Sequence, residues 1–478
     1  PPFFTYMLAC ALGGYIVLGL ITGRFEALSA VKTAYQTEPF QFFFIGRMLS
    51  AMLGVAMVLL IYLIGRRLYS KTVGLIAALF AAVNMALVNH AHFSTVDTAA
   101  AFWGLWCLYH CVRISEDGLR RHYFFAALFA AFAAATKFNM ALFFLPIVVA
   151  HLSRFPWRRW FKALFSLRLI TTGVVGVVGL LLAFPLIWLD FDETVGGLLG
   201  TGRFERVGKI GSGGGVLSYW TGDQSDGFGV FYPNSLPGTF GVLLTMLCAA
   251  GILFLLLRRK KADVLLLASL LPLYFLFEIM SIKAIRHLTP IIPLLLLTAA
   301  LVIYEIGVRM KRYGVWISAA LVLIITAANI THSVSYWRQL AAVDPRTRAH
   351  EWILANIPPK SLILTEDFPP PVPPEDDERY TDGYIVKSIR VSAKQIGIAD
   401  SVKALLKTER KLYYIADGFS RQIFGWEYTR RHYPDIAWDR VQFFDWLDRN
   451  GRLLKRFDSE NPRLQPEIFI YELTGKKR

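Results

Sequence analysis

The sequence contains little charge and little cysteine. Only 18% of its 478 residues are Asp, Glu, Lys or Arg, while 55% are hydrophobic and the mean hydropathy is +0.44. This composition excludes an ordinary soluble protein. All four cysteines lie in apolar stretches without a CxxC pair, which predicts neither a disulfide framework nor a thiol redox motif. Cys107, His110 and Cys111 share one helix face, but small core residues of a membrane helix explain them better than a metal site does.

The sequence also lacks a nucleotide phosphate loop. A glycine-rich stretch at 211–215 is preceded by no predicted strand and followed by no Gly-Lys-Ser/Thr. A phosphate loop of the Walker type needs both features. We therefore interpret this stretch as a flexible part of a long external loop, 190–236. Loops of this length more often bind or cover a ligand than simply connect two helices.

Long apolar runs dominate the first 340 residues. Runs of about 18 or more apolar residues are typical of transmembrane helices. They occur near 45–64, 74–90, 96–112, 169–189, 237–257, 263–280, 288–307 and 314–333. Residues 3–22 and 123–152 are apolar as well. We therefore predict a polytopic α-helical membrane domain at 1–338, with about 10–11 hydrophobic helices.

The formal charge of +16 would suit a nucleic acid, but the positions of the charges argue against that partner. Lys and Arg gather at every second helix connection, for example at Arg66–Arg67 and Arg258–Lys261. The positive-inside rule assigns such loops to the cytoplasm. Asp97, the loop 190–236 and the C-terminal region then lie outside. We expect an integral protein of the bacterial inner (plasma) membrane, with a periplasmic C-terminal domain and no nucleic-acid partner.

The last third, 339–478, regains charge, proline and turn residues, which indicates a small external α/β domain. Helices are predicted at 346–356, 394–407 and 419–432. Strands are predicted at 361–364, 411–415, 453–457 and 468–473. No catalytic motif stands out here, so support, gating and partner contact all stay open as roles.

The stretch 123–152 predicts a broken helix. Basic loops flank it on both sides, so it must cross the membrane an even number of times. It is too short for two spans of about 20 residues each. Two short helices that meet at Thr136–Asn139 fit better, because broken helices occur in membranes where the backbone lines a cavity or is buried. Lys137 would then project into an external cavity; the alternative is a lysine that snorkels to the interface.

A carboxylate beside two histidines lies between two apolar runs. Ionisable groups at membrane depth usually mark a functional site, and Asp97 is our catalytic candidate. Candidate phosphate-binding cations on the same side are Lys137, Lys283 and Arg286. Candidate substrate contacts are His90, His92, His287 and Arg47. The histidines and Asp97 lack a recognised metal-ligand spacing, so we assign no metal ligands and leave a requirement for a divalent metal open.

One carboxylate among several cations suits an anionic ligand that has an apolar tail. Arg and Lys bind phosphate through charge-assisted hydrogen bonds, and apolar helices would surround the tail. The sequence therefore predicts a lipid-phosphate site. The carboxylate could orient or deprotonate an acceptor hydroxyl or amine.

Five stretches carry a family resemblance: Pro1–Tyr6, Gly46–Tyr69, Asn89–Asp97, Thr136–Asn139 and Lys283–Pro290. Each is weak alone, but their order and their placement relative to the helices are specific. Together they resemble the integral-membrane glycosyltransferases of the GT-C fold. They are similar in particular to the dolichyl- or polyprenyl-phosphate-sugar-dependent family of protein O-mannosyltransferases and lipid A aminoarabinose transferases.

The resemblance implies a polyprenyl-phosphate sugar as donor and a protein or lipid acceptor on the external face. It implies that Arg286, with Lys137 and Lys283, faces the donor phosphate, and that Asp97 lies near the active site. It also implies a principal catalytic carboxylate in the first external loop, upstream of Pro1, so we expect the chain to lack that loop. Residues 3–22 are then expected to lie along the outer membrane face or to dip into it.

The leading hypothesis is therefore an inverting glycosyl transfer, with the lipid-linked sugar, the acceptor and membrane lipids as partners. The alternative is a catalytically inactive GT-C-like accessory or scaffold subunit, which would have partners in a membrane complex. A secondary transporter gains support from the broken helix, but no inverted repeat is evident and the large external domain is atypical.

Overall fold

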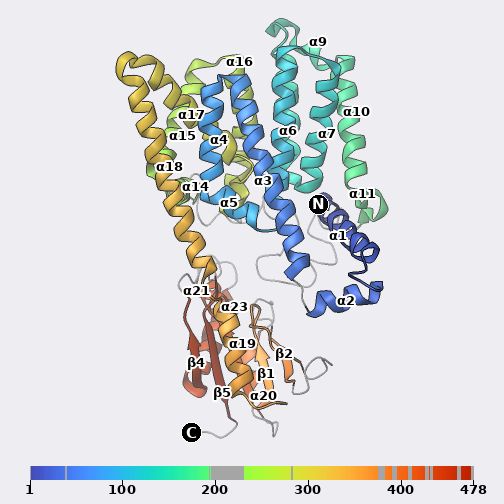
Figure 1. The fold of residues 1–478 in the computed structure, drawn as a ribbon, viewed down its shortest axis with the longest axis vertical. Helices are drawn as coiled ribbons and strands as arrows, with labels where there is room; N and C mark the ends of the chain where they lie inside the picture. Colours follow the sequence, from blue (N-terminus) through green and yellow to red (C-terminus); the bar gives the residue numbers. More distant parts are fainter. Residues whose placement is uncertain are drawn as a thin grey trace. The chain divides into compact units, whose positions relative to one another are not determined.

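The computed structural model describes residues 2–37, 40–192, 194, 231–280, 284–374, 383–389, 396–406, 412–425, 430, 434–459 and 465–474. These residues divide into two compact units, one before Val334 and one from Val334 onward. The first unit is a bundle of helices, and the second is built around a β-sheet (Figure 1).

The chain enters the bundle through six helices. They are α1 Phe3–Ile21, α2 Leu28–Thr37, α3 Phe40–Leu68, α4 Lys71–Val83, α5 Met85–His92 and α6 Val96–Glu116. Asn84 separates α4 from α5, which meet at an angle of 57°. The Asn84 backbone is extended and its side chain accepts a hydrogen bond from the Leu87 amide, so it caps α5. The run 74–90, predicted as one span, is therefore bent at this residue.

The remaining elements of the bundle alternate long helices with short turns. They are α7 Arg120–Thr136, η1 Phe138–Phe143, α8 Phe144–Leu152, η2 Trp157–Arg159, α9 Trp160–Leu164, α10 Leu167–Ala183, α11 Leu186–Leu189, α14 Phe231–Phe240, α15 Val242–Arg258, α16 Lys261–Glu278, η3 Ile285–Leu288, α17 Ile292–Arg309 and α18 Lys311–Ala341.

The predicted break at Thr136–Asn139 is confirmed, because Lys137 is extended (φ −154°, ψ 116°) between α7 and η1. The prediction of a loop over 190–236 was wrong at its end, since α14 begins at Phe231; residues 195–230 lie outside the described part.

Four helical stretches of the described chain are long and apolar enough to cross a membrane: Phe3–Ile21, Phe40–Leu68, Ile292–Arg309 and Lys311–Asn356. The number rises to as many as six if the bent pairs α4 with α5 and η1–α8 with η2–α9 each count as one span. Other predicted spans are helical but shorter or more charged. α7 has 17 residues, and the 18 residues of α16 include three charged ones, Lys261, Asp263 and Glu278.

The basic clusters gather at one end of the bundle. The connections from α3 to α4, from α6 to α7 and from α15 to α16 all lie at the upper end in Figure 1. Close helix contacts support this arrangement. A Cβ on Gly65 would lie 2.8 Å from the Gly74 Cα, so α3 and α4 approach each other where only small residues fit. The opposite end of the bundle carries the start of α6 and the end of α7.

The second unit contains a five-stranded sheet in the order β2-β1-β3-β5-β4. Its elements are α19 Pro345–Asn356, β1 Leu362–Thr365, β2 Ile385–Ser388, α20 Ile398–Leu405, β3 Leu412–Asp417, α21 Gly418–Gly425, α23 Pro434–Asn450, β4 Arg452–Phe457 and β5 Ile468–Leu473. β1 pairs in parallel with β2 and β3, whereas β5 pairs antiparallel with β3 and β4. The predictions of α19 and of strands β1, β3, β4 and β5 are confirmed, whereas sequence reasoning missed β2 and α23.

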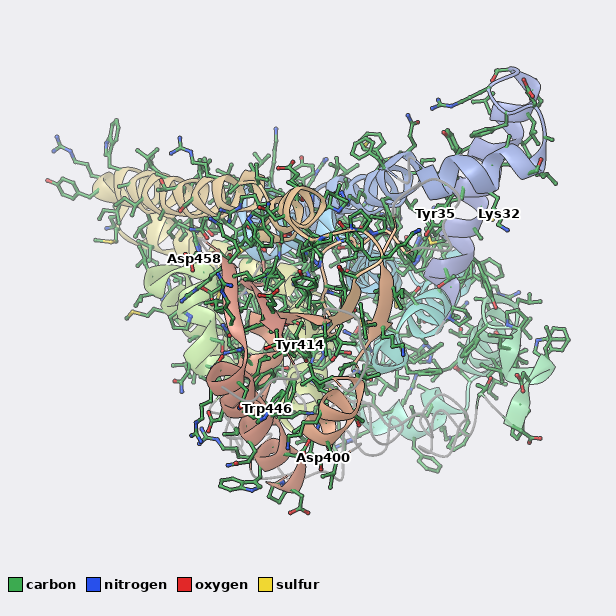
Figure 2. The ribbon with its side chains drawn as sticks, turned by 90° about the horizontal axis from the view of Figure 1, so that it is seen from below. Lys32, Tyr35, Asp400, Tyr414, Trp446 and Asp458 are labelled. Carbon is green, nitrogen blue, oxygen red and sulfur yellow. The ribbon has the colours of Figure 1, made fainter. Side chains whose placement is uncertain are left out.

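Two buried acids follow the parallel strands. Glu366 accepts hydrogen bonds from the Tyr414 hydroxyl and the Asp417 amide, both at 2.8 Å. Asp417 accepts from the amide and hydroxyl of Ser420 at 2.7 and 2.8 Å. Burial raises the pKa of Glu366 well above its usual range, and it raises the pKa of Asp417 as well. Tyr414 lies in the interior of this unit, whereas Asp400 of α20 lies at its edge (Figure 2).

We predict that the second unit becomes less stable as the pH rises above about 4, the ordinary pKa of a carboxyl group. The pKa values of both acids in the folded protein lie above their values of about 4 in the unfolded chain. The contribution of the two protonated acids to the free energy of unfolding is therefore fully present below about pH 4. It is lost as the pH rises through the pKa values of the folded protein. Protease sensitivity of the full-length protein, measured against temperature at several pH values, tests this. Glu366→Gln should make the pH dependence shallower; an unchanged slope would contradict the role of Glu366.

Candidate functional site

The first turn of α6 and the break after α7 bring a carboxylate and an ammonium together. Lys137 Nζ donates a hydrogen bond to Asp97 Oδ1 at 2.7 Å. The Asp97 side chain is 6% exposed and the Lys137 side chain is 17% exposed. Removing water from two charges is costly, and their attraction offsets that cost only while both partners are present. The pair therefore constrains where α6 begins and where α7 ends.

Close contacts with α3 position the segment that precedes Asp97. A Cβ on Gly46 would lie 2.7 Å from Ser94 Oγ, and a Cβ on Gly54 would lie 2.7 Å from the Ala91 Cβ. Neither glycine can carry a side chain unless its neighbour moves. α3 thus packs directly on α5 and on the turn into α6. This packing determines the position of Asp97 along the axis of the bundle.

Two histidines lie around the ion pair. His90 and His287 are each within electrostatic range of Asp97, Lys137 and Arg286. His287 is buried, and its Nδ1 lies 3.4 Å from the Tyr232 hydroxyl. The structure therefore gathers five of the predicted site residues: Asp97, Lys137, Arg286, His90 and His287.

The ring of Phe277 lies beside this cluster. Its centroid is 5.8 Å from Lys137 Nζ and 6.1 Å from the centre of the His287 ring. A cation over an aromatic face is attracted by the electron-rich ring. Phe277 thus gives the ammonium an apolar wall in addition to its carboxylate partner.

Arg286 is an exposed cation near His90 and His287. It lies in the short turn η3, its side chain is exposed, and it forms no ion pair with any residue of the described ranges. An arginine without a carboxylate partner can offer its planar set of donors to an incoming phosphate. Lys283, predicted to act with it, lies outside the described residues.

Arg47 and His92 form a separate pair of predicted residues. They lie within electrostatic range of each other, and Arg47 is exposed on α3. Neither is among the groups that act on His90 or His287. Arg47 and His92 thus interact with each other, and α5 carries both His92 and His90.

Sequence reasoning missed a second polar group on α16. Glu278 is fully buried and accepts a hydrogen bond from the Tyr274 hydroxyl at 2.7 Å. The Tyr274 ring lies 6.4 Å from the ring of Tyr232, which connects this group to His287. The sequence did contain a signal for this group, since Glu278 lies near the end of the apolar run 263–280. A carboxylate at membrane depth needs a partner. Among the described residues, no three His, Cys, Asp or Glu side chains are grouped closely enough to bind a metal ion.

The sequence carries a family match over the part that contains the ion pair. Residues 42–188 match the family described as dolichyl-phosphate-mannose-protein mannosyltransferase. The chain resembles the GT-C membrane glycosyltransferases. The matched range includes Asp97 and Lys137 and ends before Arg286, so it covers one side of the cluster.

Several solved structures are similar to the chain. One is ArnT from Cupriavidus metallidurans bound to undecaprenyl phosphate, at 12% identity over 93% of this chain and 87% of that one, with a TM-score of 0.49. Another is the Archaeoglobus fulgidus oligosaccharyltransferase in its apo form, at 15% identity over 87% of this chain and 61% of that one, with a TM-score of 0.48. None of the curated proteins matches the chain.

We predict that Asp97→Asn destabilises the protein by about 3–5 kcal/mol, because it leaves the Lys137 ammonium buried without its counter-charge. The double variant Asp97→Asn with Lys137→Met should recover a large part of that loss. Denaturant unfolding of the full-length protein in detergent measures both effects.

A matched control is the Arg67–Glu116 pair, whose side chains are 34% and 36% exposed. Solvent screens that pair, so Glu116→Gln should cost less than about 1 kcal/mol. If Asp97→Asn and Glu116→Gln lowered the free energy of unfolding equally, burial would not make the Asp97–Lys137 pair more important for stability than an exposed pair.

Proposed function

We propose that this chain transfers a sugar from a polyprenyl-phosphate donor to a protein or lipid acceptor. The observation that carries the proposal is the buried Asp97–Lys137 pair with the exposed Arg286 in electrostatic range of the same histidines. The family that matches residues 42–188 is named for a lipid-phosphate sugar, which supports this class of donor. The cluster combines a phosphate-binding group and a carboxylate, and glycosyl transfer from a lipid phosphate needs both.

In the proposed complex, Arg286 makes the first contact with the donor phosphate. Lys137 is proposed to contribute a second donor without leaving Asp97, because an ammonium has three N–H groups and the carboxylate uses one of them. Lys283 is proposed to act beside them. Negative charge grows on the phosphate as the sugar leaves, and cations that are already in place stabilise that charge most effectively.

Asp97 is proposed to act on the acceptor. Oδ1 is engaged by Lys137, whereas Oδ2 has no hydrogen-bond partner among the described residues. The acceptor hydroxyl or amine attacks the anomeric carbon, the bond from that carbon to the phosphate oxygen breaks, and the lipid phosphate leaves with the electron pair. The acceptor proton passes to Oδ2. A single displacement of this kind inverts the anomeric configuration.

We place this chemistry at the external face of a bacterial inner membrane. The basic connections at one end of the bundle would then lie in the cytoplasm. Asp97 begins α6 at the end that is remote from those connections. We propose that α18, which starts at Lys311 beside the last basic connection, crosses the membrane once and that the α/β unit is external as well.

Arg286→Ala is predicted to lower turnover by about 100- to 1,000-fold, because the leaving phosphate loses a donor. Transfer of labelled sugar from polyprenyl-phosphate donors in membranes, with the full-length protein, measures this. Lys71→Ala is the matched control, since Lys71 is an exposed cation at the basic end of the bundle. Unchanged turnover in Arg286→Ala would contradict the proposed role.

Asp97→Asn is predicted to abolish transfer while polyprenyl phosphate still binds, because Asn cannot accept the proton but leaves Arg286 in place. Asp97→Glu should retain part of the activity, since it keeps a carboxylate near Lys137. Binding of labelled polyprenyl phosphate and sugar transfer are measured on the same preparations. Full sugar transfer by Asp97→Asn would show that Asp97 takes no part in the reaction. A wild-type protein that binds the lipid phosphate but transfers no sugar would instead support the inactive scaffold subunit.

A further inference from the structure

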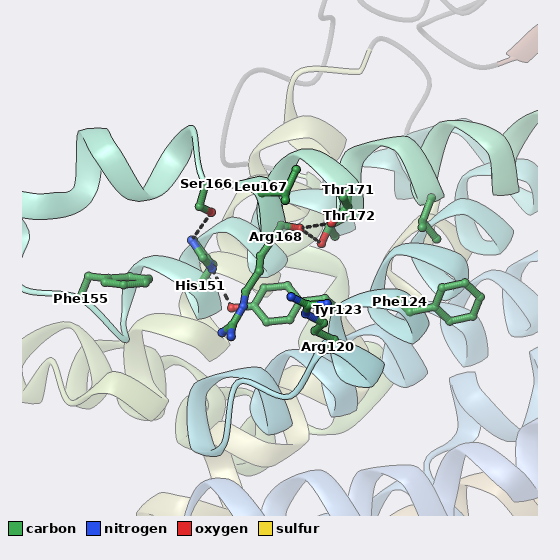
Figure 3. Close-up of a pocket in the computed structure, with 11 residues that line it drawn as sticks. Arg120, Tyr123, Phe124, His151, Phe155, Ser166, Leu167, Arg168, Thr171 and Thr172 are labelled. Atoms are coloured by element: carbon green, nitrogen blue, oxygen red, sulfur yellow. Dashed lines mark hydrogen bonds between the residues drawn. The ribbon is translucent and has the colours of Figure 1, made fainter.

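A cavity lies at the basic end of the bundle. It has a volume of about 650 Å³ and is formed where α7 and α10 begin and α8 ends (Figure 3). Its polar lining consists chiefly of Arg120, Tyr123, His151, Ser166 and Arg168. α7 has 17 residues and rises about 1.5 Å per residue, so its first residue, Arg120, lies about 25 Å from Lys137 at its other end. The cavity is therefore distinct from the cluster around Asp97.

A buried histidine organises the polar wall of this cavity. His151 is 1% exposed, and its Nδ1 lies 2.7 Å from the Tyr123 hydroxyl. Its Nε2 lies 3.1 Å from the Ala163 carbonyl and 3.1 Å from Ser166 Oγ. With the proton on Nε2, the ring donates to the carbonyl and accepts from Tyr123. The Ser166 hydroxyl, which accepts from the Leu169 amide, then keeps its own proton for a ligand (Figure 3).

The cavity presents cations that have no acidic partner. Arg120 and Arg168 line it, and Arg154 acts with Arg168 on both Tyr123 and His151. None of the three forms an ion pair with a carboxylate of the described residues. The nearby acids are engaged elsewhere, since Glu116 pairs with Arg67 and Asp117 pairs with Arg113. Arg154 and Arg168 each donate one hydrogen bond to a backbone carbonyl, that of Ile114 and of Gly118. The two guanidinium groups that line the cavity thus lack a carboxylate partner among the described residues, which favours an anion.

The surroundings of the cavity are those of a membrane interface. Trp157 and Phe161 are 72% and 75% exposed, and they alternate with the basic residues Arg158, Arg159 and Lys162. The helical segment that carries them is bent by 116° from η1–α8, so it does not continue across the bundle. Exposed aromatic rings interleaved with cations are typical of the headgroup level of a bilayer.

An apolar stripe leads away from the cavity along α10. Leu167, Ile170 and Val174 are exposed, and their spacing places them on one face of the helix. Leu167 also lines the cavity, so the stripe begins at its rim. The hydroxyls of Thr171 and Thr172 bond to the Arg168 carbonyl and add no further donor to a ligand. A ligand here would meet cations at one end and hydrocarbon-compatible surface at the other.

We propose that this cavity binds the headgroup of an anionic phospholipid. The phosphate contacts the guanidinium groups of Arg120 and Arg168 and the hydroxyl of Ser166, and the acyl chains lie along the stripe on α10. Basic pockets between membrane helices on the cytoplasmic side bind such headgroups. The volume suits a glycerophosphate headgroup, and the bound lipid links the ends of α7, α8 and α10.

The test measures how phosphatidylglycerol changes the melting temperature of the full-length protein in detergent. Phosphatidylglycerol should raise the wild-type melting temperature, whereas phosphatidylcholine should not. Arg120→Gln with Arg168→Gln should weaken the apparent affinity by about tenfold or more. The matched control, Arg158→Gln with Arg159→Gln, removes two exposed cations that do not line the cavity and should keep the wild-type response.

Two outcomes would overturn the proposal. One is an equal response of both double variants and the wild type, which would show non-specific attraction to anionic lipid. The other is an equal stabilisation by inorganic phosphate, which would identify a site for a free anion. If the cavity variant does not accumulate, Leu167→Glu places a carboxylate at the exposed rim instead. Native mass spectrometry should then show one fewer bound phosphatidylglycerol than in the wild type, and an unchanged number would contradict the site.

Discussion

The positions of the first turn of α6 and the end of α7 depend on the buried contact between Asp97 and Lys137. Neither charge is stable among apolar helices without the other, so the first turn of α6 and the end of α7 must face each other. The two helices are joined at their other end by the short connection after Glu116. The extended backbone at Lys137 then directs its side chain across to α6. His90, His287 and the exposed Arg286 lie around the charges that this contact fixes.

The two ends of α7 differ in how their cations are used. At one end, Lys137 is neutralised by a carboxylate and stays mostly buried. At the other end, Arg120 and Arg168 line an open cavity without an acidic partner among the described residues. In our account, the first end binds the phosphate of a substrate that must leave, while the second binds the phosphate of a lipid that stays. A lipid that links α7, α8 and α10 would keep the helix that carries the reactive lysine in place.

The sequence predicted the elements better than their contacts. The helix break at Lys137 was predictable, because the run 123–152 is too short for two spans and has a lysine at its middle. The ion pair between Asp97 and Lys137 was not predictable. The position of Asp97 along the bundle axis depends on how the glycines of α3 pack against Ala91 and Ser94. The contact between Tyr232 and His287 was missed because the two residues are 55 positions apart in the sequence, whereas Glu278, whose partner Tyr274 lies one turn away on α16, could have been found. In the second unit, β2 has four residues and a half-exposed pattern, which gives little alternation to detect.

A structure of the full-length protein with a bound polyprenyl phosphate would show whether the Asp97–Lys137 pair belongs to the donor site. We expect the phosphate to lie within hydrogen-bond distance of Arg286 and Lys137, with Lys137 still in contact with Asp97. The apolar chain should leave the site between the helices of the bundle. A phosphate bound elsewhere, with the Asp97–Lys137 pair intact and no ligand at Arg286, would show that this ion pair is structural and that the donor site lies in another part of the protein.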